Sequence, residues 1–299
     1  MNQPHPRFPE FKYYQPKSLK EAVDFLDKHA DQSRPYAGGT DCLNQVRDRK
    51  IYPQYLVDLK SIEGFRKIKF DQKEGLTIGA TVPLNEIISH PKVKKHYPVL
   101  IDAAREVGGY QLRNRATLVG NLCNASPCGD TIGPCLAYCS KVQIVGQDGK
   151  HEVGLKDFFK GPGKTCLKPG EIVESISLPI PPTGVEGAYQ SIGRNKFGDL
   201  AIAAVTVLGY EKKDNQSGYE FLLTLSAVAP IVIFADSAQD ILNTQPINYS
   251  ILEQAASACR EACKPIDDIR SSAHYRRDMV RILALRGLEK TCKLLNIPV

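Results

Sequence analysis

The first eighty residues combine one amphipathic segment with short apolar runs. Apolar side chains recur at helical spacing within residues 16–28, at Leu19, Ala22, Val23, Phe25 and Leu26. Ser18 followed by Glu21 forms a capping box, which predicts that a helix begins there. Two short segments rich in apolar residues, 55–59 and 75–82, are typical of strands. This order of elements predicts a small α/β unit at the start of the chain.

The middle of the chain returns to helical spacing and then alternates. Residues 98–108 predict an amphipathic helix that ends at Gly108 and Gly109. A long polar stretch follows, and such a stretch inside a folded domain is often functional. A short helix is expected over 133–139. The Asp148-Gly149 step predicts a hairpin turn between two strands.

From about residue 180 the pattern changes to strands followed by helices. Strands are expected over 187–194, 200–211 and 219–229. Ser250 and Glu253 form a second capping box before an apolar-periodic segment, and a terminal helix is expected over 272–294. Strands followed by helices favour a separate α+β domain. The predicted division is 1–178, with parts 1–58 and 59–178, followed by 179–299.

Composition narrows the class of protein. The 299 residues are 42% hydrophobic and 24% charged, which indicates a globular chain that can bury a substantial core. No apolar run reaches the roughly 20 residues of a membrane span, and the proline-rich start has no secretory pattern. We therefore expect a cytoplasmic protein. The net charge of +6 is scattered among acids without a recognised module, so nucleic acid is not an expected partner.

Four of the nine cysteines crowd one segment, at Cys123, Cys128, Cys135 and Cys139. An iron–sulfur or zinc site has to be considered, but the spacing lacks the C-x2-C pairs of most metal knuckles. Cys135 and Cys139 are four residues apart, as expected for one buried helix face where thiols act as small hydrophobes. No metal site is predicted.

The stretch "YAGGTDCLNQVRDR" (36–49) contains the sharpest local signal. Paired glycines allow a positive φ and a close approach of backbone amides, and consecutive amides form a concave nest for phosphate oxygens. An ordinary tight turn is the alternative interpretation. The segments "QLRNRATLVGN" (111–121) and "NASPCGD" (124–130) repeat this glycine-polar character later in the chain.

These three segments, in this order, resemble the FAD-binding medium subunit of molybdenum hydroxylases. That family includes the flavin subunits of carbon monoxide dehydrogenase and nicotinate dehydrogenase and the flavin domain of xanthine dehydrogenase. Similarity extends over nearly the whole chain and includes "LKPGEIVESISLPIP" (167–181) and "AVAPIVIFADSAQDIL" (227–242). The resemblance implies a two-part FAD-binding domain of the vanillyl-alcohol-oxidase (PCMH) type and a smaller α+β C-terminal domain. It implies no extra [4Fe–4S] cluster of the hydroxybenzoyl-CoA reductase branch, whose insertion is missing here.

By resemblance, both glycine loops hold the pyrophosphate, Asp130 reaches the adenosine end, and Leu167 packs on the dinucleotide. Taken alone, Asp130 could cap the next helix and Leu167 could be ordinary core. The expected cofactor-binding set is Tyr36, Ala37, Gly38, Gly39, Thr40, Asp41, Cys42, Leu43, Val107, Gly108, Thr117, Leu118, Val119, Gly120, Asn121, Asp130, Leu167 and Arg194. No side-chain nucleophile or acid–base pair is expected.

Two positions depart from the family pattern. The second loop usually reads T-x-G-G-N, but here Val119 replaces the first glycine. A β-branched side chain at that position is expected to alter or loosen the phosphate contact. Gln190 replaces a lysine that often follows the tyrosine of the strand near 189, and a missing cation could change the reduction potential of the flavin or its preferred acceptor.

The resemblance implies an electron-transfer subunit. Molybdopterin is expected on a large partner subunit and two [2Fe–2S] clusters on a small one, with electrons passing through FAD to NAD(P), a quinone, oxygen or a carrier protein. The assembly implied is a heterotrimer. Two alternatives stay open: a self-contained flavoenzyme resembling the enolpyruvyl-glucosamine reductases, and a structural subunit that has lost FAD.

Overall fold

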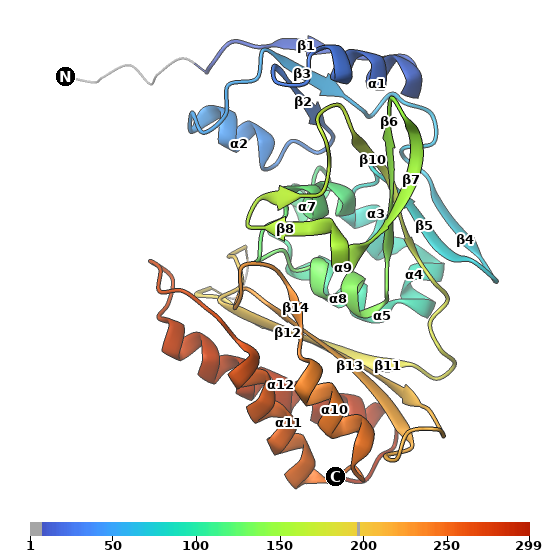
Figure 1. The fold of residues 1–299 in the computed structure, drawn as a ribbon, viewed down its shortest axis with the longest axis vertical. Coiled ribbons are helices and arrows are strands. Elements are labelled where there is room, and N and C mark those ends of the chain that lie inside the picture. Colours follow the sequence, from blue (N-terminus) through green and yellow to red (C-terminus); the bar gives the residue numbers. More distant parts are fainter. Residues whose placement is uncertain (1–7, 196–197) are drawn as a thin grey trace.

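Residues 12–58 build a small parallel sheet with two helices. The computed structural model describes residues 8–195 and 198–299. Its first elements are β1 (Lys12–Tyr14), α1 (Leu19–Lys28), β2 (Ser33–Tyr36), α2 (Cys42–Arg47) and β3 (Tyr55–Asp58). The strand order is β1-β3-β2, with both pairs parallel. This layer lies at the top of Figure 1.

Helix α1 begins where the sequence predicts. The hydroxyl oxygen of Ser18 accepts a hydrogen bond from the Glu21 amide at 3.1 Å. The Glu21 carboxylate accepts from the Lys17 amide at 2.8 Å, so only the serine half of the capping box has its expected partner. Ala22, Val23 and Leu26 are buried, as the helical spacing indicates.

The central layer is an antiparallel five-stranded sheet that is packed against several helices. Strand order is β4-β5-β10-β6-β7, and β8 pairs with β9 separately. The elements are β4 (Ile68–Asp71), β5 (Gly75–Gly79), α3 (Leu84–Ser89), α4 (Pro91–His96), α5 (Pro98–Glu106), α6 (Tyr110–Arg113), α7 (Leu118–Asn124), α8 (Ile132–Ala137), β6 (Lys141–Gly146), β7 (Gly149–Gly154), α9 (Leu155–Phe158), β8 (Phe159–Gly161), β9 (Lys164–Thr165) and β10 (Ile172–Leu178). Hairpin β6–β7 turns at Gln147-Asp148, with Gly149 at φ +105°, as the Asp148-Gly149 step predicts.

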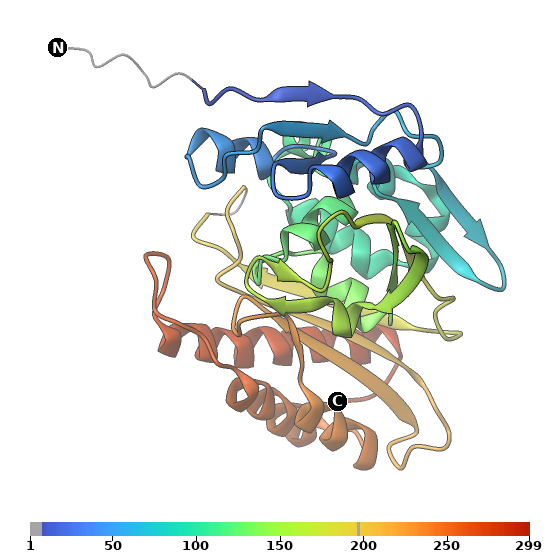
Figure 2. The same cartoon turned by 45° about the horizontal axis from the view of Figure 1, so that its top comes forward.

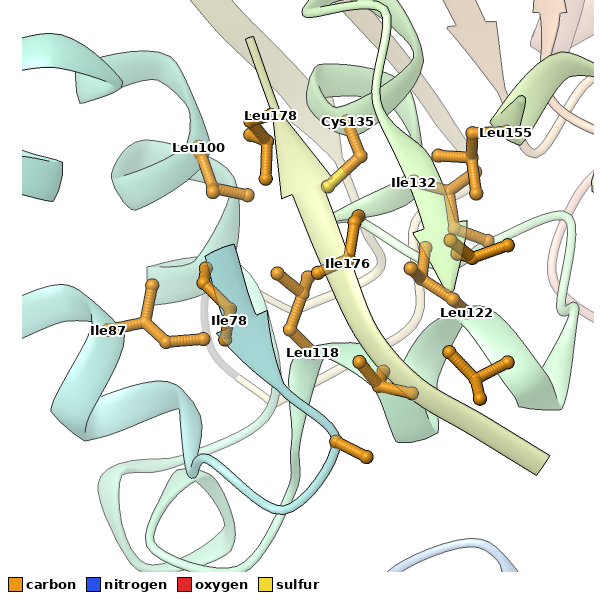
Figure 3. Packing of buried hydrophobic residues seen from close by; sticks show 14 of the residues in the cluster. Ile78, Ile87, Leu100, Leu118, Leu122, Ile132, Cys135, Leu155, Ile176 and Leu178 are labelled. Atoms are coloured by element: carbon orange, nitrogen blue, oxygen red, sulfur yellow. The ribbon is translucent and has the colours of Figure 1, made fainter. Parts of the chain in front are cut away.

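One apolar cluster joins this sheet to its helices. Figure 3 shows Ile78 of β5 and Ile176 of β10 facing Leu118 of α7, with Cys135 of α8 close by. All four side chains are fully buried. Burial of aliphatic side chains contributes roughly 1.5–3 kcal/mol each, so this cluster fixes the position of α7 and of the polar segment beside it.

The C-terminal layer is a four-stranded antiparallel sheet with three long helices on one face (Figures 1 and 2). It contains β11 (Glu186–Ile192), β12 (Ala203–Glu211), β13 (Tyr219–Ser226), β14 (Ile233–Phe234), α10 (Asp236–Thr244), α11 (Tyr249–Ala262) and α12 (Ala273–Leu294). Helices α10 and α12 pack on this sheet, whereas α5 and α8 of the central layer meet its other face. The fold is therefore α+β, as expected, and the helix predicted over 272–294 is confirmed.

The predicted second capping box is wrong. Helix α11 begins at Tyr249, and its N-cap is Asn248, whose Oδ1 accepts from the Ile251 amide at 3.1 Å. Ser250 therefore lies inside the first turn. Asparagine is among the strongest N-cap residues, and its position before the apolar run determines where the helix starts.

One backbone hydrogen bond ties the C-terminal layer to the central one, and a buried arginine braces its donor residue within the C-terminal layer. The Ala227 amide donates to the Pro127 carbonyl oxygen at 2.8 Å. The buried guanidinium of Arg276 on α12 donates to the carbonyl oxygens of Ile202 and Ala227 and to the Asp268 carboxylate at 2.7–3.0 Å. The segment before Asp130 is thus held by a strand about one hundred residues further along the chain.

Candidate functional site

The glycine pair after β2 lies in a turn that a side chain would block. A Cβ added to Gly38 would overlap the carbonyl oxygen of Arg115, and one added to Gly39 would overlap the ring of Tyr36. Gly39 also has φ +77°, a conformation that L-residues rarely adopt. The turn is therefore wedged between the Tyr36 ring and the chain at Arg115, and glycine is required at both positions.

The amides of this turn are free to bind a ligand. Within residues 8–195 and 198–299, the N–H groups of positions 38–42 donate no hydrogen bond to the protein. The Gly39 and Asp41 carbonyl oxygens accept bonds from Leu43 and Gln45, so the carbonyl groups are used while the amides remain. Consecutive unpaired amides can form a nest for anionic oxygens, which is the role that the sequence predicts for this turn.

The second predicted loop is mostly a helix start. Thr117 is the N-cap of α7, and its hydroxyl oxygen accepts from the Gly120 amide at 3.0 Å. Leu118 and Val119 are both buried in the central core. The Val119 side chain therefore does not stand on the surface of the segment, and the expected steric interference with phosphate has no basis in the structure. Gly120 and Asn121 are half-buried and remain accessible.

The two glycine-polar segments lie side by side. Gly38 packs on the backbone at Arg115, and the Gln45 amide group donates to Asn124 Oδ1 at 3.3 Å between α2 and α7. Asn121 Oδ1 in turn accepts from the Thr131 hydroxyl at 2.7 Å. These contacts connect the turn after β2, the start of α7 and the segment that carries Asp130.

The turn at Val107 and Gly108 is held by one arginine. The guanidinium of Arg113 donates to the carbonyl oxygens of Arg105, Val107 and Gly108 at 2.7–3.2 Å. Gly108 has φ +50° and ends the segment begun by α5, as predicted. Arg113 thus satisfies the C-terminal carbonyl groups of this helix.

Asp130 is almost fully buried and pairs with Tyr189. The Tyr189 hydroxyl donates to Asp130 Oδ1 at 2.7 Å, and Asp130 is 7% exposed. Burial raises the pKa of Asp130 to about 6; the Glu106 carboxylate adds to the rise, and the bond from Tyr189 opposes it. The N-cap of α8 is Thr131, so capping by Asp130 is not its role here.

Asp130 and Tyr189 line a cavity of about 680 Å³ between α5, β11 and α12. The charged residues of its wall are Asp102, Arg105, Glu106, Asp130, Arg194, Asp199 and Lys290. Gln190 also lines it, and Arg194 is ion-paired with Asp199 at 3.1 Å. Among the predicted cofactor-binding residues, Asp130 and Arg194 therefore share one cavity.

Leu167 lies apart from that wall. It is half-buried beside β9 and packs against the central core. The β8–β9 hairpin borders the end of α7 through a bond from the Gly163 amide to the Ala125 carbonyl oxygen at 3.0 Å. Leu167 thus lies on the side of the β8–β9 hairpin and the end of α7, and not in the cavity wall that contains Arg194.

The four clustered cysteines occupy different environments. Cys135 is fully buried in α8, but Cys139 follows the helix in a left-handed conformation with φ +53° and is exposed. The predicted common buried face is therefore wrong for Cys139. Cys128 Sγ accepts a hydrogen bond from Arg270 at 3.7 Å. In the described part of the chain, no group of three His, Cys, Asp or Glu side chains is placed to hold a metal ion.

Sequence reasoning missed a charged cluster beside the glycine turn. Asp58 ends β3, is 2% exposed, and accepts hydrogen bonds from Lys60 Nζ at 2.5 Å and from the Tyr13 hydroxyl. Lys60 Nζ lies 4.3 Å from the centre of the Tyr36 ring. An acid that ends a buried strand, followed two residues later by a lysine, was the available signal.

Two family descriptions together cover almost the whole chain. Residues 9–181 match the FAD binding domain in molybdopterin dehydrogenase, and residues 188–291 match the CO dehydrogenase flavoprotein C-terminal domain. The chain belongs to the FAD-binding medium subunits of the molybdenum hydroxylase family. The resemblance seen in the glycine-polar segments is thereby confirmed.

Relatives among these medium subunits match along their full length. The glyceraldehyde dehydrogenase medium chain of Sulfolobus acidocaldarius is 29% identical, with 94% of this chain and 98% of the relative covered. The carbon monoxide dehydrogenase medium chain of Afipia carboxidovorans is also 29% identical, with 94% and 96% covered. Carbon monoxide dehydrogenase from Hydrogenophaga pseudoflava superposes with a TM-score of 0.91 at 28% identity, covering 96% of this chain and 98% of the other.

The glycine turn fits the cofactor of this family. A pyrophosphate needs unpaired donors and bare backbone nearby, and the turn provides five free amides, two of them at glycines where an added Cβ would clash. Searched over the described residues, no helix of this medium subunit has the length and apolar character to span a membrane.

Proposed function

We propose that this medium subunit carries electrons within a molybdenum hydroxylase complex. Its partners would be a large molybdopterin-binding subunit and a small subunit with two [2Fe–2S] clusters, in a heterotrimer. Electrons would leave through FAD to NAD(P), a quinone, oxygen or a carrier protein. The observation that carries the proposal is the nest of free amides at positions 38–42 in a chain that matches medium subunits from end to end.

We propose that the pyrophosphate of FAD binds between the turn at 36–43 and the start of α7. The amides of Gly38 to Cys42 would donate to one phosphate, and Thr40 would add its hydroxyl. Gly120 and Asn121 would border the other phosphate, because Thr131 holds the Asn121 side chain in place. Leu118 and Val119 would act indirectly, because their buried side chains anchor α7 in the core.

The remaining residues would contact the rest of the dinucleotide. Asp130 would accept a hydrogen bond from the adenosine end, with its carboxylate oriented by Tyr189. Ala37, Leu43, Val107, Gly108 and Leu167 would supply apolar or backbone surface around it, and Arg194 would act from the wall of the cavity that it shares with Asp130. FAD exchanges electrons singly or in pairs, so it can link one-electron iron–sulfur centres to two-electron acceptors.

The chain division and location are also proposals. Residues 1–178 would form the FAD-binding domain, in parts 1–58 and 59–178, and 179–299 the C-terminal domain; the three larger sheets, one in each of these parts, support this division. A cytoplasmic location is supported by the nine cysteines, all of which are free in the described chain.

The test is purification of the protein from its native host with its partners attached. We expect one FAD per medium subunit in the visible spectrum and cofactor extract, together with molybdenum, iron and two further polypeptides. FAD without metals or partners would replace the proposal with a self-contained flavoenzyme. Metals and partners without flavin would replace it with a structural subunit.

A further inference from the structure

The Asp58 cluster lies where a ligand site is expected in a parallel sheet. Strand β2 ends at Tyr36 and β3 at Asp58, and these two residues are register partners. Ligands of open α/β sheets bind beyond the carboxyl ends of parallel strands. The glycine turn leaves β2 at this edge, so Asp58 and Lys60 are adjacent to the proposed pyrophosphate site without belonging to the turn.

The cluster holds one aromatic ring against the turn. Lys60 Nζ is fixed by Asp58 at 2.5 Å and lies 4.3 Å from the centre of the Tyr36 ring. The Tyr13 ring meets the same ring edge-on, with 6.2 Å between ring centres. On its other side the Tyr36 ring lies against Gly39, where an added Cβ would overlap the ring. Tyr36 therefore transmits the position of Lys60 to the glycine turn.

The charges of the cluster are compensated within it. Burial alone would raise the pKa of Asp58, but hydrogen bonds from Lys60 and Tyr13 hold it below its usual value. The Lys60 side chain is 30% exposed, whereas that of Asp58 is 2% exposed. Removal of Lys60 would leave a buried carboxylate without a cation, which is strongly unfavourable near an anionic ligand.

We propose that Lys60, held by Asp58, is a positioning residue for FAD: it fixes the Tyr36 ring beneath the Gly38-Gly39 turn and so keeps the turn in the form whose amides are free. This inference rests on the proposed function. The cluster prepares the site before the cofactor arrives, and such preorganisation raises affinity because less freedom is lost on binding.

The experiment is a titration of the full chain, freed of flavin, with FAD, followed by flavin fluorescence. K60M should bind FAD about tenfold more weakly than the wild type, which corresponds to about 1.4 kcal/mol. K60R should recover most of the affinity, because a guanidinium also pairs with a carboxylate and stacks on an aromatic ring. The matched control is K67M, since Lys67 forms a surface ion pair with Glu63 at 3.5 Å and both side chains are largely exposed.

A double substitution separates positioning from charge alone. In K60M/D58N the buried carboxylate is gone, so the positioning role requires the same loss of affinity as in K60M. Recovery to the wild-type affinity would show that the loss came from the unpaired charge alone and would overturn the positioning role. Thermal unfolding of the flavin-free variants is measured in parallel. The loss of FAD affinity in K60M should be larger than the change in its unfolding midpoint can account for.

The outcomes separate the two proposals. If the wild-type chain and K67M bind FAD but K60M binds equally well, the positioning role is wrong and the proposed function stands. The positioning role is also wrong if K60R loses as much affinity as K60M. If the wild-type chain binds no FAD at all, the proposed function itself is overturned.

Discussion

The two ends of the proposed flavin site are built from different groups. The turn at 36–43 offers backbone amides, and its side chains matter chiefly by their absence at Gly38 and Gly39. The end at Asp130 offers side chains, a buried carboxylate paired with Tyr189 in a charged cavity. One end is defined by conformation and the other by ionisation.

This difference determines how each end responds to change. Backbone amides do not titrate at ordinary pH, so the glycine turn should be sensitive to added atoms and insensitive to proton concentration. A buried carboxylate changes charge within the accessible pH range, so the Asp130 end should respond to pH and to isosteric substitution. The expected effects below follow this contrast, beginning with the largest.

Addition of a single methyl group to the glycine turn should weaken FAD binding and lower stability. In G38A the new Cβ overlaps the Arg115 carbonyl oxygen, a backbone atom that cannot rotate away. We expect FAD affinity to fall by about a hundredfold, and the free energy of unfolding to fall by about 1–3 kcal/mol, typical of overpacking. FAD titration and chemical denaturation measure the two effects.

The control for this change is G154A. Gly154 has φ −60°, and an added Cβ would lie 3.8 Å from the nearest atom, so FAD affinity should be unchanged. Equal FAD affinity for G38A and the wild type would show that the turn does not contact the cofactor.

The Asp130 end should make stability depend on pH. The folded pKa is about 6 and the reference value is 3.8, so between these values the folded chain binds more protons than the unfolded chain. The free energy of unfolding should therefore fall as pH rises from about 4 to 6, by about 3 kcal/mol for a shift of about two pKa units.

The comparison variant for this effect is D130N, which keeps the shape and cannot ionise. Urea denaturation at pH 4, 5, 6 and 7 should give a difference between wild type and D130N that changes with pH over this window. Parallel curves for the two proteins would mean that Asp130 is not buried as described. FAD affinity of D130N should also vary less with pH than that of the wild type.

Removal of the Tyr189 hydroxyl should give the smallest effect. The bond from Tyr189 favours the ionised form of Asp130, so in Y189F the pKa of Asp130 should rise further and the fall in stability should move to higher pH. Stability at pH 7 should drop by about 1.5 kcal/mol, the lower end of the range for a hydrogen bond to a charged group.

Y14F provides a matched control because Tyr14 also donates to a carboxylate, that of Glu21 at 2.6 Å, but on the surface. Its pH curve should keep the wild-type midpoint near Asp130's pKa. A midpoint that moves equally in Y14F and Y189F would exclude a specific coupling between Tyr189 and Asp130.

Local signals in the sequence predicted much of the fold. Ser18 marks the start of α1, and the glycine pair at 38–39 marks the turn that the structure leaves without side chains. The capping-box pattern at Ser250 and Glu253 predicts the wrong cap, because Asn248, two residues earlier, caps α11. Signals of this kind depend on residues only a few positions apart, so they can be recognised from the sequence without knowledge of the fold.

The unpredicted part of the site depends on contacts between distant positions. Tyr189 and Asp130 are 59 residues apart, and Tyr13 and Asp58 are 45 apart. Their pairing follows from strand order and register, which hydrophobic patterns do not specify. The burial of Val119 is unpredicted for the same reason, because only the packed fold shows that its side chain enters the core.

The hydrogen bond from the Ala227 amide to the Pro127 carbonyl oxygen limits where the chain can be divided into separate parts. A fragment of the chain that ends near residue 181 would contain Asp130. It would lack Tyr189 and the strand that supports the segment before Asp130. Exchange of C-terminal halves between relatives would therefore replace part of the proposed flavin site along with the half. The proposed site belongs to the chain as a whole, because the Asp130 side chain and the Tyr189 hydroxyl that orients it come from different halves.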